Sequence, residues 1–171
     1  MLPRGQPLLL PASPVFIWGS LALALMLNLL PLGRMAWMPD FLAVVLVFWS
    51  IYQPRRVGLT AGFLFGLALD VQQSSLLGQH ALAYAVLIYF AIMVHRHVLW
   101  FSMRGQALQL LPLFAAAHGI VIVVRLLVGG LLPGWDVLLA PLLEAALWPA
   151  VSWLLLAPQR RAPNTDPTRP L

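Results

Sequence analysis

The chain has 171 residues, of which 61% are hydrophobic and only 9% are charged. A soluble domain carries roughly 25% charged residues, so this composition excludes a soluble globular protein and predicts one compact integral membrane protein. The net charge of +5 comes from arginines in short connectors and tails, without interleaved exposed aromatic residues, which argues against nucleic-acid binding. The absence of cysteine excludes disulfides and thiolate chemistry.

Apolar segments separated by proline, glycine and polar residues predict a bundle of about six transmembrane helices. In chain order they cover residues 15–32, 41–52, 57–71, 81–94, 107–132 and 137–157. Crossing a bilayer takes roughly 20 apolar residues, so the second to fourth segments are short. Polar ends, tilt in a thinned bilayer or a re-entrant path would each accommodate them.

The first apolar segment follows Arg4, as in a secretory signal. It is about eighteen residues long, whereas the apolar core of a signal has roughly 7–15, so we expect an uncleaved first span. The proline-rich, polar end of the chain is typical of disorder. We therefore expect an N-terminal tail over residues 1–14, a six-helix membrane domain over 15–157 and a disordered C-terminal tail over 158–171.

The placement of arginine predicts the orientation in the membrane. With six spans, eight of the ten basic residues lie on the side that holds both termini: Arg4, Arg55, Arg56, Arg96, Arg104, Arg160, Arg161 and Arg169. The opposite connectors hold only Arg34, so the positive-inside rule places both termini in the cytoplasm. We expect interfacial tryptophans at the inner boundary (Trp18, Trp49 and Trp100) and at the outer one (Trp37 and Trp135).

Small residues mark one face of the third predicted helix. Gly58, Gly62, Gly66 and Asp70 recur every fourth residue, and a four-residue step returns to nearly the same helix face. Small residues let membrane helices approach closely, so we expect this strip to contact another helix, either within the chain or in a partner. A ligand cavity lined by the strip is the alternative.

Residues around the end of this strip complete the set of contact candidates. We expect Asp70 to cap a helix end or to contact a loop, and Gly78, after the loop, belongs to the same set of helix-packing or partner-contact residues. Ser74 and Ser75 are expected to be loop or capping hydroxyls rather than nucleophiles.

Two ionisable residues fall inside predicted spans. Arg125 and Glu144 each lie about seven residues from the outer end of antiparallel neighbours, which predicts a buried ion pair. His118 lies seven residues before Arg125 on nearly the same face, so the fifth span has a polar stripe. A proton or substrate relay, a packing clamp, or Arg125 snorkelling to lipid headgroups are the possible roles.

Motifs of known enzymes are missing from the sequence. It has no nucleophile-elbow serine motif, no His-Glu-x-x-His metal site and no glycine-rich phosphate loop. We therefore expect a protein that is not an enzyme, with no catalytic residues, no cofactor and no metal.

The segment from residue 38 to residue 90 resembles the core of the MreD family of rod shape-determining proteins. The resemblance rests on a proline near the start of the second span, a proline–arginine turn after it, a glycine-rich third span ending in aspartate, and a Leu-Gly pair opening the fourth. Here these are Pro39, Pro54 with Arg56, Gly62 and Gly66 with Asp70, and Leu77 with Gly78. Leu147, Trp148 and Pro149 in the last span also resemble the family, and the length and six-span topology match nearly end to end.

This resemblance implies a non-catalytic, multi-pass subunit of the bacterial inner membrane. Such a subunit is part of the elongasome, is needed for rod cell shape and lateral peptidoglycan synthesis, and acts as a membrane scaffold with MreC. The implied direct partner is the transmembrane helix of MreC; MreB, RodA and a class-B penicillin-binding transpeptidase belong to the wider complex, and membrane lipids surround it.

The implied fold is similar to the substrate-binding subunits of energy-coupling-factor transporters. That similarity supplies the alternative function, a substrate-binding membrane subunit of a small-molecule, vitamin-type transporter. A polar, ligand-sized pocket open near Asp70 favours the transporter, whereas an apolar, lipid-facing groove suited to a partner helix favours the scaffold.

Overall fold

The structure is a computed structural model that describes residues 12–30, 37–73 and 76–159. Within these ranges it is entirely helical, with six α-helices and no strand: α1 (Pro14–Leu29), α2 (Phe41–Tyr52), α3 (Leu59–Gln73), α4 (Gln79–Val98), α5 (Met103–Leu127) and α6 (Leu139–Leu156). Short 3-10 segments, η1 (Trp135–Leu138) and η2 (Ala157–Gln159), flank α6. Most of both expected tails, together with Arg34, Ser74 and Ser75, lies outside the described residues.

Three helical segments are long and apolar enough to cross a membrane. They are Gln79–Val98, Met103–Leu127 and Trp135–Gln159, whereas α1 and α2 are shorter apolar helices. The chain is therefore a helical membrane protein. The fourth helix is longer than the sequence predicted, with 20 residues.

Helix α5 begins and ends earlier than the predicted segment 107–132. Its C-terminus is set by Gly129, which has a left-handed backbone (φ 84°) that glycine adopts without a steric penalty. The N–H of Gly130 then turns back to donate to the carbonyl of Arg125 at 2.9 Å. The helix consequently stops at Leu127, and Arg125 falls in its last turn.

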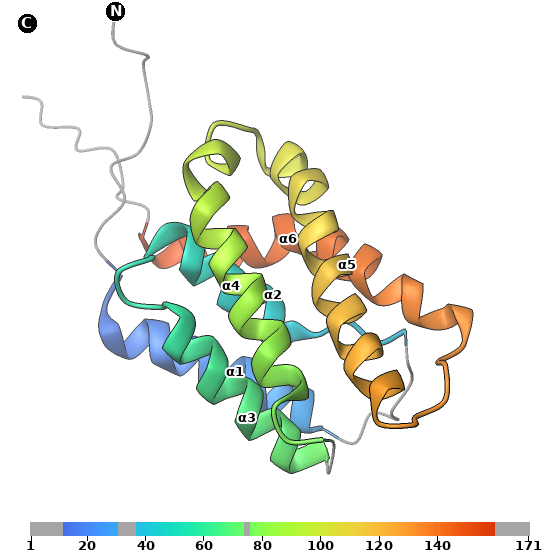
Figure 1. The fold of residues 1–171 in the computed structure, drawn as a ribbon. Coiled ribbons are helices and arrows are strands. Elements are labelled where there is room, and N and C mark those ends of the chain that lie inside the picture. The colour runs from blue at the N-terminus through green and yellow to red at the C-terminus, as the bar shows by residue number, and fades with distance from the viewer. Residues whose placement is uncertain (1–11, 31–36, 74–75, 160–171) are drawn as a thin grey trace, which may run out of the picture.

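Consecutive helices run in alternating directions (Figure 1). In that view the α2–α3 and α4–α5 connectors lie at the left and the top, whereas the ends that join α3 to α4 and α5 to α6 lie at the bottom and the right. Helix α4 packs against α3, α5 and α2, and α6 crosses behind and packs against α5 and α2.

Helix α2 is the enclosed centre of the bundle. Every residue from Leu42 to Ile51 is buried, and α2 contacts α1, α4 and α6. A helix that is apolar on all sides lies either in a protein core or in a membrane, and these 12 residues span about 18 Å, less than the roughly 30 Å hydrocarbon core of a bilayer. The neighbouring helices, rather than lipid, therefore surround α2.

The burial of α2 corrects the prediction for Trp49. Its side chain is fully buried, packs edge-on against Phe16 and Phe48, and donates from Nε1 to the Ser20 hydroxyl at 2.8 Å. Trp49 therefore does not contact the lipid interface as an anchor, because its helix faces other helices all round. Trp100 and Trp135, in contrast, are each 89% exposed.

The glycine strip of α3 lies against α4. A Cβ atom at Gly66 would lie 2.5 Å from the Ala81 Cα, and one at Gly62 would lie 3.2 Å from the Tyr84 carbonyl oxygen. Only glycine allows the two backbones to come this close. Gly58 lies before the start of α3, and nothing lies within 4 Å of the position where its Cβ would be.

The strip provides a matched pair of substitutions. Gly66→Ala forces α3 away from the α4 backbone and should destabilise the protein by about 1–3 kcal/mol, the usual cost of overpacking. Gly58→Ala meets open space and should leave stability unchanged or slightly raised. Size-exclusion chromatography of heated, detergent-solubilised protein measures both; equal melting temperatures would contradict the close contact.

Candidate functional site

The side chain and backbone of Asp40 join four helices at one end of the bundle. Asp40 caps α2, because its Oδ1 accepts the N–H of Ala43 at 3.0 Å. The same oxygen accepts Nδ2 of Asn28 in α1 at 2.6 Å, and Oδ2 accepts the hydroxyl of Tyr84 in α4. The backbone N–H of Asp40 donates to Oε1 of Glu144 in α6 at 3.0 Å. One residue thus holds α1, α4 and α6 to the start of α2.

Glu144 extends this junction to α5. It is fully buried, and Nε2 of His118 lies 2.7 Å from its Oε1, which also accepts the Asp40 N–H. Its second oxygen, Oε2, is buried without a hydrogen-bond partner among the described residues. Glu144 therefore connects α2, α5 and α6 through a single oxygen atom.

The partner of Glu144 corrects the sequence-based expectation. The pair expected with Arg125 is wrong: Glu144 pairs with His118, and no ion pair of Arg125 is found in the described part of the chain. The physical reason is the end of α5 at Leu127, which places Arg125 in the last helical turn with an exposed side chain. His118, about two turns earlier, lies at the level of Glu144. A cation in the last turn interacts favourably with the helix dipole.

Asp70 makes a second junction, between α3 and α4. Its carboxylate is fully buried and accepts the backbone N–H groups of Gly78, His80 and Ala81 at 2.9, 2.9 and 3.3 Å. Nδ1 of His80 lies 2.7 Å from Oδ1. The first N–H groups of a helix have no partners within the helix, and a negative charge is favourable there. Gly78 supplies the left-handed backbone (φ 98°) that turns the chain into α4.

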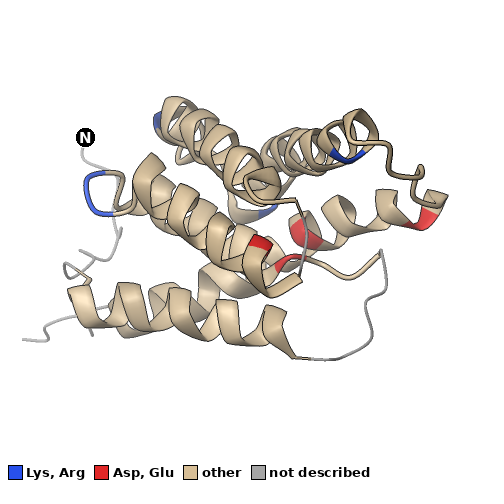
Figure 2. Ribbon diagram, turned by 60° about the horizontal axis from the view of Figure 1, so that its bottom comes forward, with Lys and Arg blue, Asp and Glu red and all other residues tan. Residues whose placement is uncertain are grey.

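Three of the acidic residues form one cluster. Asp40, Asp70 and Glu144 all lie close enough to Tyr84 to act on it electrostatically. Figure 2 shows the acidic positions on α3, on α6 and at the start of α2 close together, away from the basic α2–α3 connector. No group of three or more metal-ligating side chains able to hold an ion is found among the described residues. This carboxylate cluster holds helix ends together through hydrogen bonds.

The sequence carries a local signal for the position of Asp40 at the start of α2. Aspartate directly before an apolar helical segment is an N-cap signature, here reinforced by Pro39. Its contacts with Asn28 and Tyr84, which lie 12 and 44 positions away, depend on tertiary packing and have no local signal.

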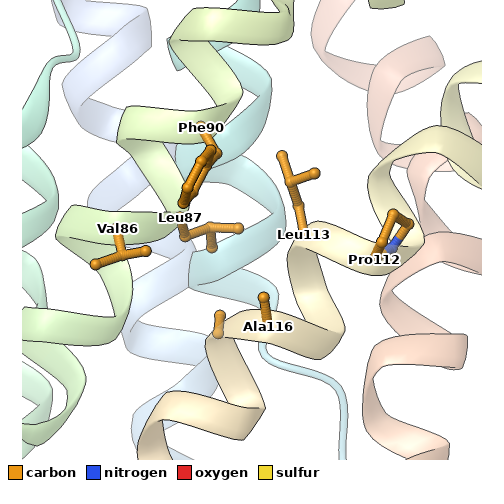
Figure 3. A pocket seen from close by; sticks show the side chains of 7 residues that line it. Val86, Leu87, Phe90, Pro112, Leu113 and Ala116 are labelled. Carbon is orange, nitrogen blue, oxygen red and sulfur yellow. The ribbon is translucent and has the colours of Figure 1, made fainter.

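An apolar hollow lies between α4 and α5, outside the carboxylate cluster. Its volume is about 220 Å³, and it is lined by Val86, Leu87, Phe90, Pro112, Leu113, Ala116 and Ala117. Figure 3 shows side chains from both helices bordering this space. The lining residues lie near the middle of α4 and of α5. We call this hollow the α4/α5 groove.

All-helical architecture, long apolar helices and buried polar junctions define a helical membrane protein. Its family is shown by sequence comparison: the model of the rod shape-determining protein MreD matches residues 12–157. The rod shape-determining protein MreD of Haemophilus influenzae is 28% identical over 135 residues, which cover 77% of this chain and 80% of that protein. The chain belongs to the MreD family of rod shape-determining proteins. No solved structure matches it.

The loss of stability on substitution distinguishes the two candidate partners of Glu144, His118 and Arg125. His118→Ala leaves a buried carboxyl group with one donor fewer, which should cost about 1–3 kcal/mol. Arg125→Ala removes an exposed side chain and should stay within about 0.5 kcal/mol of the parent. Both are measured by reversible denaturant unfolding in mixed micelles; a larger loss for Arg125→Ala than for His118→Ala would restore the expected pair.

Proposed function

We propose that this chain is a non-catalytic inner-membrane scaffold subunit of the elongasome, which acts with MreC in rod cell shape and lateral peptidoglycan synthesis. Its membership of the MreD family over residues 12–157 is the observation that carries the proposal. In this proposal the transmembrane helix of MreC is the direct partner. MreB, RodA and the class-B penicillin-binding transpeptidase belong to the wider complex.

The contacts of the glycine strip narrow the choice of partner surface. Gly62 and Gly66 face α4 at backbone distance, so a second helix cannot occupy the same strip. Asp70 and Gly78 are likewise engaged in the α3–α4 connection. The proposed contact with MreC therefore lies elsewhere, and we assign it to the α4/α5 groove.

The chemistry of the groove suits an apolar helix. The groove lies at mid-helix depth, where a membrane provides only acyl chains and other transmembrane helices. Its volume of about 220 Å³ is below the roughly 300–1,000 Å³ of small-molecule sites and suits individual side chains of a partner. Pro112 and Ala116 are exposed, and the Cβ position of Gly119, three residues further on, is open. Small residues at this spacing allow a second helix to approach α5 closely.

The burial of α5 supports the same surface. Only 17% of its most apolar 18-residue window is buried within the chain, compared with 39% for α4 and 33% for the segment that contains α6. Of these three segments, α5 therefore has the largest share of its surface left for lipid or for a partner.

The positions of the arginines support a proposal for the orientation of the chain in the membrane. We propose that both termini, the α2–α3 connector with Arg55 and Arg56, and the facing ends of α4 and α5 with Arg96 and Arg104 lie in the cytoplasm. Arginines near the anionic inner leaflet gain about 1 kcal/mol each from its surface potential. The carboxylate cluster then lies toward the periplasmic side.

A pair of tryptophan substitutions tests the groove. Ala116→Trp fills it, whereas Ala22→Trp adds the same bulk to an exposed position of α1. In cells depleted of the native protein, Ala116→Trp should lower co-purification of MreC at least tenfold, which corresponds to about 1.4 kcal/mol, and should produce rounded cells. Ala22→Trp should preserve both MreC binding and rod shape.

Three outcomes would change this proposal. Ala116→Trp protein that folds and retains both MreC and rod shape would remove the groove as the contact. Loss of rod shape with unchanged MreC binding would favour an acyl chain or another partner in the groove. Depletion that leaves rods intact but impairs vitamin uptake would instead support the transporter subunit.

A further inference from the structure

The second carboxylate oxygen of Glu144 has no donor in a cluster where other acidic oxygens are hydrogen-bonded. Oε1 of Glu144 has two neighbours, the Asp40 N–H and His118 Nε2, whereas Oε2 is buried without a partner in the described part of the chain. The residue is fully buried. A buried ionised carboxylate with an unpaired oxygen is strongly unfavourable, because it loses its hydration without replacement.

The polar groups of the cluster that contains Glu144 come from the other five helices, and two of these groups, Asp40 and His118, contact Glu144 directly. Asp40 caps α2, Asp70 ends the strip of α3, and Tyr84 and His80 belong to α4. His118 comes from α5, and α1 contributes the neutral Asn28. The cluster thus combines three carboxyl groups with two histidines, and no arginine forms an ion pair with it among the described residues.

The three carboxyl groups differ in the number of hydrogen-bond donors that they have, and this difference affects the protonation of Glu144. Asp70 has three backbone N–H donors and its own histidine, and Asp40 accepts from Ala43, Asn28 and Tyr84. Each oxygen of both carboxyl groups therefore has a hydrogen-bond donor. Among the described residues Glu144 has the fewest donors of the three, and the charge of the nearby Asp40 carboxylate makes a second negative charge there unfavourable.

We propose that Glu144 is a proton-binding site, which carries its proton on Oε2 in the assembled bundle. The neutral carboxylic acid keeps Oε1 as the acceptor of the Asp40 N–H and of the His118 ring. His118 contacts the buried acid and has a side chain that is 24% exposed, so it is the group through which the proton exchanges. This inference does not depend on MreC or on the α4/α5 groove.

Release of the proton places a negative charge between α2, α5 and α6. An unfolded glutamate is ionised above about pH 4.3, so at neutral pH the folded chain binds one more proton than the unfolded chain. Stability then falls as the pH rises, because the protonated state favours folding. The site makes the attachment of α5 and α6 to α2 dependent on protonation.

The composition of the chain allows a direct test, because Glu144 is its single glutamate. The full chain is made by cell-free synthesis with glutamate labelled with ¹³C at the side-chain carboxyl, reconstituted into phosphatidylethanolamine–phosphatidylglycerol vesicles, and measured by infrared spectroscopy at neutral pH. The expected result is a protonated-carboxyl C=O band that moves on ¹³C labelling and on exchange into D2O. A labelled band of the carboxylate type alone would overturn the proposal.

Two variants separate proton binding from a merely structural role. His118→Gln keeps a hydrogen-bond donor but cannot titrate, so the labelled acid band should remain while its D2O exchange slows at least tenfold. Asp136→Asn removes an exposed carboxyl group and should change neither the band nor the exchange. Unchanged exchange in His118→Gln would overturn the assigned route.

Discussion

The attachment of Asp40 to its neighbours is the interaction on which the arrangement of helices depends. Helix α2 is too short to cross a bilayer and apolar on every side, so burial alone gives it no preferred depth or rotation. The cap at Asp40 supplies both, because Asn28, Tyr84 and Glu144 reach it from three different helices. A polar group in an apolar bundle has few alternative partners, and its hydrogen bonds therefore specify one packing among many apolar ones.

Close backbone contact between α3 and α4 fixes a second part of the helix packing. Gly62 and Gly66 bring α3 against α4, and Asp70 fastens the connection between these helices by accepting the first N–H groups of α4. Gly62 and Gly66 of α3 therefore contact α4 of the same chain. The surface that we propose for another membrane protein lies on α4 and α5, where Pro112 and the alanines after it border the α4/α5 groove.

Local signals explain which parts of this structure are predictable from sequence. The bounds of α2 were predicted residue for residue, because Asp40 before it and Gln53-Pro54 after it stop a continuous apolar segment. The family resemblance likewise rests on proline and glycine residues at the ends of helices and in turns. The end of α5 was misplaced because apolar residues continue beyond the helix, and only the left-handed turn at Gly129 ends it.

Tertiary contacts explain the rest. The partner of Glu144 changed from Arg125 to His118 once α5 ended earlier, since a shift of a few residues changes both depth and face. Trp49 was placed at a boundary because its position near the end of an apolar segment is typical of an anchor. Its burial follows from the enclosure of α2 by other helices, which no pattern within residues 41–52 specifies.

The most direct test of the Asp40 junction is a double-mutant cycle between Asp40 and Tyr84. Unfolding free energies of the parent, Asp40→Ala, Tyr84→Phe and the double variant are measured by steric trapping in bicelles. A junction that fixes the packing predicts a coupling energy of about 1 kcal/mol or more between the two sites. Additive losses, with coupling near zero, would show that α2 keeps its place without Asp40 and would contradict the account.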